Sequence, residues 1–110
     1  MKKITGDVNL NNLYLREIPS ILNDVVIEDG RFNIDSNSIK NLNNFPLSCN
    51  TIYLSNNPIR SLVGIKQKKA AYLEVSITNI KNLEGCPEIV TSLTITYVDD
   101  FNSLKGNLKK

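Results

Sequence analysis

One stretch of this chain, IYLSNNPIRSL at residues 52–62, constrains the fold more than any other because related stretches recur along the sequence. Close matches begin at residues 32 (FNIDSNSIKNL) and 73 (LEVSITNIKNL), and weaker ones begin near 8 and 93. Starts at 8, 32, 52, 73 and 93 give steps of 24, 20, 21 and 20 residues. A repeat of this length predicts a solenoid in which each unit packs against its neighbours.

Each repeat contains apolar residues two positions apart, and such residues point to the same face of a β-strand. The predicted strand is only about three residues long, which is too short to be stable alone. Successive repeats must therefore stack their strands side by side and place equivalent side chains in columns. Four apolar columns result: Val8, Phe32, Ile52, Leu73, Leu93; Leu10, Ile34, Leu54, Val75, Ile95; Leu15, Ile39, Ile59, Ile80, Phe101; and Ile18, Leu42, Leu62, Leu83, Leu104.

A polar column follows each predicted strand, with Asn37, Asn57 and then Thr78. A side-chain amide inside a tight bend can satisfy backbone groups that the bend leaves unpaired. Leu13 and Val98 stand at the equivalent positions of the end repeats and cannot do this, so we expect differently shaped or looser bends there. Repeats of 20–21 residues also leave too little chain for a full helix on the other side of each repeat.

The pattern resembles the leucine-rich repeat, L-x-x-L-x-L-x-x-N-x-L-x-x-L, in its short bacterial or phage form. The resemblance implies a leucine-rich-repeat solenoid of about five repeats, with a short parallel β-sheet on the concave face and a convex side of extended, turn or single-turn helical segments. The whole chain, 1–110, is then one domain with an N-terminal cap at 1–7 and a C-terminal tail at 105–110. Leucine-rich repeats are mostly protein-interaction scaffolds, so the resemblance also implies a protein-binding role.

Composition argues against several other classes of function. The chain has 13 Lys and Arg against 11 Asp and Glu, a net charge of +2, which gives no strong field for nucleic acid or membranes. It has no histidine, the commonest general base and metal ligand. We therefore expect a protein that is not an enzyme and uses no cofactor or metal. With only short apolar runs, such as Val25–Ile27, we also expect no membrane contact and a cytoplasmic location, the host cytoplasm if the chain is phage-encoded.

The cysteines and the paired acids have structural interpretations. Cys49 and Cys86 align with apolar positions of other repeats, which predicts buried thiols. Two cysteines without histidine cannot complete a four-ligand zinc site unless carboxylates join them. The pairs Glu28–Asp29 and Asp99–Asp100 lie between repeats and are interpreted as solvated turn residues, with metal binding or acid–base chemistry as the alternative.

The predicted sheet surface is the part that the fold does not dictate. Tyrosine and arginine are enriched at binding hot spots, and several lie at outward positions of the repeats. The candidate contact residues are Arg31, Tyr53, Tyr72, Glu74, Ile77 and Tyr97. The alternative is that tyrosine merely suits exposed strands.

These observations predict a module that binds another protein through its concave sheet, for example a phage-encoded inhibitor of a host or defence protein. The AT-rich codons of its abundant Asn, Ile and Lys suggest a phage or low-GC source. One alternative is a structural protein that forms a homodimer or larger assembly through the uncharged edge strand 92–98. Another is a small nucleic-acid-binding protein that uses Lys66, Lys68 and Lys69, which we instead interpret as a solubilising convex turn.

Overall fold

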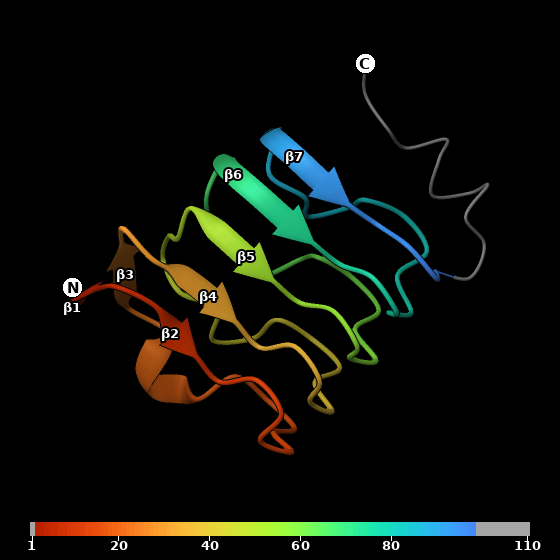
Figure 1. Ribbon diagram of the computed structural model, residues 1–110, viewed down its shortest axis with the longest axis horizontal. Helices are drawn as coiled ribbons and strands as arrows, with labels where there is room; N and C mark the ends of the chain where they lie inside the picture. Colours follow the sequence, from red (N-terminus) through yellow and green to blue (C-terminus); the bar gives the residue numbers. More distant parts are fainter. Residues whose placement is uncertain (1, 99–110) are drawn as a thin grey trace.

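The strands of the repeats form one parallel sheet in the computed structural model, which describes residues 2–98 (Figure 1). The chain is a parallel β-solenoid of about 4 turns. Each strand lies beside the strand of the preceding repeat, which confirms the predicted stacking. The order of strands in this sheet is β2 (Val8–Asn9), β4 (Arg31–Asn33), β5 (Thr51–Tyr53), β6 (Lys69–Glu74) and β7 (Ile89–Thr94).

The strand register confirms the apolar columns. Ile52 pairs with Phe32 on one side and with Leu73 on the other, and all three side chains are fully buried. The columns that begin at Leu10 and Leu15 are likewise fully buried in the central repeats. Burial of each such side chain stabilises the fold by roughly 1.5–3 kcal/mol before the loss of conformational entropy. The solenoid interior is therefore one continuous apolar core.

The first and last repeats are less well covered. Val8 and Leu10 in the first repeat, and Leu93 and Ile95 in the last, are only half-buried although they belong to the same columns. Two members of the predicted columns, Phe101 and Leu104, lie outside the described residues.

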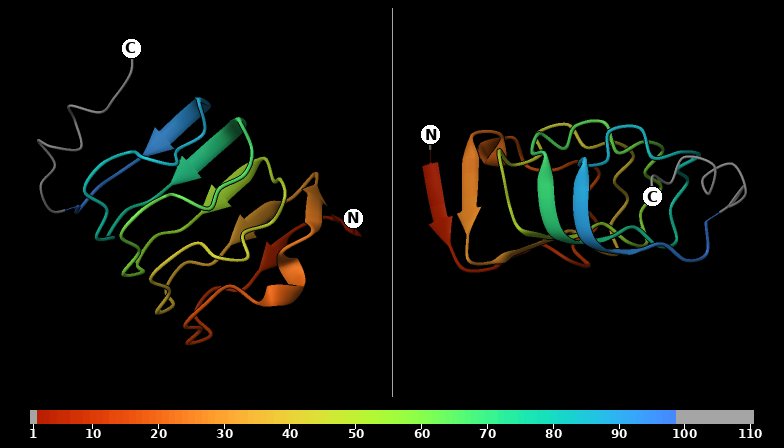
Figure 2. Two further views of the ribbon diagram at one scale, coloured as in Figure 1. Left: turned by 180° about the vertical axis from the view of Figure 1, so that it is seen from behind. Right: turned by 90° about the horizontal axis from the view of Figure 1, so that it is seen from above.

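A second, two-stranded parallel sheet stands beside the N-terminal end of the main sheet (Figure 2). It pairs β1 (Lys2–Thr5) with β3 (Val25–Glu28), so part of the predicted cap forms a strand. The chain then turns a corner from β3 into β4 through Gly30. A Cβ atom at Gly30 would lie 2.0 Å from the carbonyl oxygen of Gly6, so only glycine fits this corner.

The segments opposite the sheet contain almost no helix, as the short repeats predict. Within residues 2–98 the only helix is the 3₁₀ helix η1 (Ser20–Leu22). In that same range, no helix has the length and apolar character needed to cross a membrane. Cys49 is buried as expected, and burial raises the pKa of its thiol to about 12. Cys86 is only half-buried.

The asparagine column ties neighbouring bends together. Asn57 accepts a hydrogen bond from the Ile39 N–H at 3.1 Å, and its amide nitrogen lies 2.9 Å from the carbonyl oxygen of Ile34. Asn37 accepts hydrogen bonds from the backbone N–H groups of Leu13 and Leu15. The second repeat thus supplies the amide that Leu13 cannot. The first bend is still shaped differently, because Tyr14 adopts a φ of 58°.

Candidate binding surface

The outward-facing positions of the main sheet and of the bends that follow it define four rows, called here the outer rows. Strand pairing and the backbone hydrogen bonds beyond it place equivalent residues side by side. The first row is Asp7, Arg31, Thr51, Tyr72 and Ser92, and the second is Asn9, Asn33, Tyr53, Glu74 and Thr94. The third is Asn11, Asp35, Ser55, Ser76 and Thr96, and the fourth is Asn12, Ser36, Asn56, Ile77 and Tyr97.

The third row is largely structural, which the sequence pattern did not predict. The carboxylate of Asp35 accepts a hydrogen bond from the Ser55 N–H at 2.7 Å. The Ser55 hydroxyl oxygen accepts one from the Ser76 N–H at 2.9 Å, and the Ser76 hydroxyl oxygen accepts one from the Thr96 N–H at 3.0 Å. Ser55 and Ser76 are consequently buried. Their hydroxyl groups hold successive repeats together instead of facing a partner.

Two tyrosines and a glutamate form a connected cluster on the first and second rows. The rings of Tyr53 and Tyr72 lie with centroids 5.4 Å apart and planes tilted by 55°. The Tyr72 hydroxyl is hydrogen-bonded to Glu74 Oε1 at 3.1 Å and to Thr94 Oγ1 at 3.0 Å. Glu74 Oε2 accepts a hydrogen bond from the Ser55 hydroxyl at 2.8 Å. The Tyr72 ring is therefore held by two hydrogen bonds of its hydroxyl, and the Tyr53 ring packs beside it.

The electrostatics of this region centre on two carboxylates. Burial raises the pKa of Asp35; the hydrogen bond from the Ser55 backbone lowers it, and the charge of Glu74 raises it further. The pKa of Tyr72 is also raised: its hydrogen bond with Thr94 lowers the value, but desolvation together with the hydrogen bond and charge of Glu74 outweighs that effect. The outer rows thus hold negative charge in a partly desolvated setting.

The fourth row has a backbone conformation that most residues avoid. The φ angles of Asn12, Ser36 and Asn56 are 56°, 58° and 57°, and those of Ile77 and Tyr97 are 55° and 54°. Asparagine is several-fold enriched in this left-handed region, whereas a β-branched or bulky residue there is an outlier. Ile77 and Tyr97 are nevertheless 51% and 85% exposed, so burial does not offset their strain.

The structure places the predicted contact residues in two separate groups, with Arg31 outside both. Tyr53, Tyr72 and Glu74 touch one another, and Ile77 and Tyr97 occupy neighbouring places in the fourth row. Arg31 is exposed but is separated from Tyr72 by the whole of strand β5.

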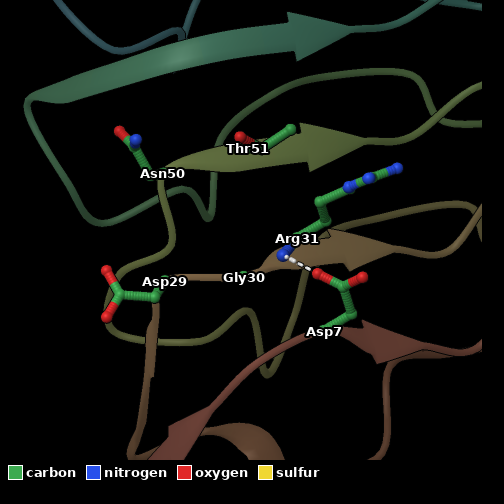
Figure 3. A pocket seen from close by; sticks show the side chains of 6 residues that line it. All are labelled: Asp7, Asp29, Gly30, Arg31, Asn50 and Thr51. Carbon is green, nitrogen blue, oxygen red and sulfur yellow. Dashed lines mark hydrogen bonds between the residues drawn. The ribbon is translucent and has the colours of Figure 1, made fainter.

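Arg31 instead lines a hollow of about 330 Å³ at the start of strands β4 and β5 (Figure 3). Asp7 and Asp29 lie on opposite sides of this hollow, and the Asp7 carboxylate accepts a hydrogen bond from the Arg31 N–H at 2.8 Å. No group of three or more histidine, cysteine or acidic residues that could hold a metal ion occurs in the part of the chain that the structure describes. The residues that line the hollow thus include both acidic and basic side chains, and they favour no single ligand.

Two further residues of interest were missed from the sequence. Tyr14 is 89% exposed in the first bend, but it stands outside the outer rows and its repeat is degenerate. Asp35 is the second residue, and its proximity to Glu74 depends on how adjacent repeats are aligned, which the repeat pattern alone does not show. The sequence signal that could have pointed to Asp35 is its acidic side chain directly after a predicted strand.

One member of the lysine cluster at 66–69 makes a contact within the fold. The Lys66 ammonium donates hydrogen bonds to the backbone carbonyl and the side-chain oxygen of Asn23, at 3.0 and 2.9 Å. Lys66 thus fastens the end of η1 to a distant repeat. The last strand, β7, stands at the end of the strand order of the main sheet, and the homodimer expected through the edge segment 92–98 stays a prediction. The pair Asp99–Asp100 lies outside the described residues.

Comparison of the chain with protein-family models, with curated proteins and with solved structures gives no match. The case for a function therefore rests on the geometry and chemistry of the outer rows.

Proposed function

We propose that the chain is a leucine-rich-repeat module without catalytic activity that docks another protein on the C-terminal half of the outer rows. The contact residues are the aromatic pair Tyr53 and Tyr72 and the two bend residues Ile77 and Tyr97. The observation that carries the proposal is the left-handed backbone of the exposed Ile77 and Tyr97.

A left-handed φ costs a bulky residue roughly 1–2 kcal/mol relative to asparagine or glycine. The equivalent bends hold Asn12 and Asn56, which suit this conformation, and Ser36, which is neither bulky nor β-branched. Ile77 and Tyr97 accept the strain while holding apolar side chains in solvent. Burial against a partner would offset both costs, and strained residues are known to cluster at functional sites.

The tyrosine pair supports the same conclusion. Hot spots in protein interfaces favour tyrosine, and rigid side chains lose little entropy when a complex forms. The contacts of Tyr72 with Glu74 and Thr94 supply that rigidity. The asparagine column and the parallel register support the leucine-rich-repeat assignment, since both are features of that repeat.

The test is affinity capture from a lysate of the cells that produce the protein. The variant Ile77→Asn/Tyr97→Asn removes both apolar side chains and relaxes the backbone, so we expect a fold at least as stable as the wild type and loss of the captured partner. Val63→Asn is the matched control, because Val63 is 55% exposed and lies outside the outer rows. Equal capture of the same protein by wild type and double variant would overturn the proposal.

A further inference from the structure

The outer rows are acidic on a chain whose net charge is positive. They contain the carboxylates of Asp7, Asp35 and Glu74 but only one cationic side chain, Arg31, and no lysine. The chain as a whole has a net charge of +2. This separation of charge favours a partner surface that is basic where it meets the sheet.

Two of these carboxylates flank the tyrosine pair. Asp35 and Glu74 both hydrogen-bond Ser55, the first through the Ser55 N–H and the second through its hydroxyl. Tyr53 pairs directly with Glu74 in the register and lies diagonally next to Asp35 across strands β4 and β5. Asp35, Tyr53, Tyr72 and Glu74 therefore form one compact group, called here the acidic tyrosine patch.

No cation within the described chain neutralises this patch. The ion pair found among residues 2–98 joins Lys3 and Glu28, far from it in the fold. Asp35 is half-buried, and neither its Oδ2 atom nor the Tyr53 hydroxyl makes a hydrogen bond with a described residue. Desolvation and the neighbouring Glu74 both raise the pKa of Asp35, the unfavourable situation that an incoming positive charge relieves.

We infer that the acidic tyrosine patch receives an arginine side chain of the partner protein, which lies against the tyrosine rings and donates hydrogen bonds to Asp35 and Glu74. A guanidinium fits this arrangement better than an ammonium, because it is planar, stacks on aromatic faces and donates in several directions at once. The inference rests on the proposed function and names the chemistry of the partner at that surface.

The experiment uses a small probe that needs no knowledge of the partner. The peptide acetyl-Gly-Arg-Gly-amide is titrated into the isotope-labelled full chain and followed by NMR. Citrulline in place of arginine gives a control of nearly the same shape without charge. We expect saturable shifts at Ser55, Glu74 and the rings of Tyr53 and Tyr72 with a Kd on the order of 1 mM, and a fall in the pKa of Asp35 at saturation.

The variant Asp35→Asn/Glu74→Gln keeps the side-chain oxygens that Ser55 contacts but removes both charges. It should weaken arginine binding about tenfold, which corresponds to ~1.4 kcal/mol. Equal shifts from the arginine and citrulline peptides, or no saturation by about 20 mM arginine peptide, would overturn the inference. If the variant Ile77→Asn/Tyr97→Asn no longer captures the partner but the arginine probe does not bind, the proposed function is supported and only the inferred arginine contact is overturned.

Discussion

The two halves of the solenoid share a backbone but differ in the side chains placed on it. In the N-terminal half, the fourth row holds Asn12, Ser36 and Asn56, and the capping positions are Asn37 and Asn57. In the C-terminal half, Ile77 and Tyr97 take the bend positions, and Thr78 and Val98 take the capping positions. Within the fourth row, the first three repeats carry asparagine or serine, whereas the last two carry bulky side chains that meet solvent. Outside this row, Tyr14 of the first repeat is also bulky, exposed and left-handed.

The difference shows that the conformation of a fourth-row bend does not depend on which side chain occupies it. The bends keep φ angles between 54° and 58° throughout, so the stack imposes the conformation whatever residue occupies it. Side chains that fit the bend badly are tolerated because the neighbouring repeats fix it by hydrogen bonds such as that from the Ile77 N–H to the Thr96 carbonyl. The C-terminal half can therefore present apolar residues without losing the fold.

The largest expected effect tests the capping column. Asn57→Ala removes the acceptor for the Ile39 N–H and the donor to the Ile34 and Leu54 carbonyls in a buried site, so we expect it to destabilise the fold by about 3 kcal/mol. Thr78 makes one hydrogen bond there, to the Val75 carbonyl, so Thr78→Ala should cost only about 1 kcal/mol. Urea unfolding of both variants gives the two values. Equal losses would mean that the capping asparagine is no stronger a support than threonine.

An exchange of bend residues tests the strain. Ile77→Asn should stabilise the chain by about 1 kcal/mol, because asparagine accepts the left-handed conformation that isoleucine resists. Asn56→Ile should destabilise it by a similar amount, since it creates the same strain one repeat earlier. Thermal unfolding at fixed pH measures both. If the two substitutions shift the melting temperature in the same direction, strain is not what distinguishes the halves.

The smallest effect concerns the third row, where Asp35 stands in the place that Ser55 and Ser76 take in later repeats. A carboxyl whose folded pKa lies above its ordinary value of 3.8 contributes stability that is present below that value and is lost as pH rises through the folded pKa. Asp35→Asn keeps an oxygen for the Ser55 N–H, so at pH 7 it should stabilise the chain by less than about 1 kcal/mol. Unfolding curves from pH 3 to 7 should show this gain vanish at the acid end. A variant less stable than wild type at pH 7 would show that the charge of Asp35 supports the fold.

Much of the fold could be predicted from the sequence because equivalent apolar residues recur at a regular spacing. The spacing of Phe32, Ile52 and Leu73 predicts both their burial and their mutual register. The second sheet was not predicted, since the pairing of β1 with β3 begins before the first recognisable repeat. Tyr53, Tyr72, Ile77 and Tyr97 were named as surface residues, but their contacts and strain were not.

The period, the apolar columns and the parallel stack follow from the sequence alone, because burial of alternate side chains acts at every repeat in the same way. Which polar residues remain on the surface depends on contacts between repeats. Ser55 and Ser76 look equivalent to other outward residues until the next strand places an N–H against each hydroxyl. Ile77 alone would favour an extended backbone, and its left-handed bend arises from the hydrogen bonds of the repeats on either side.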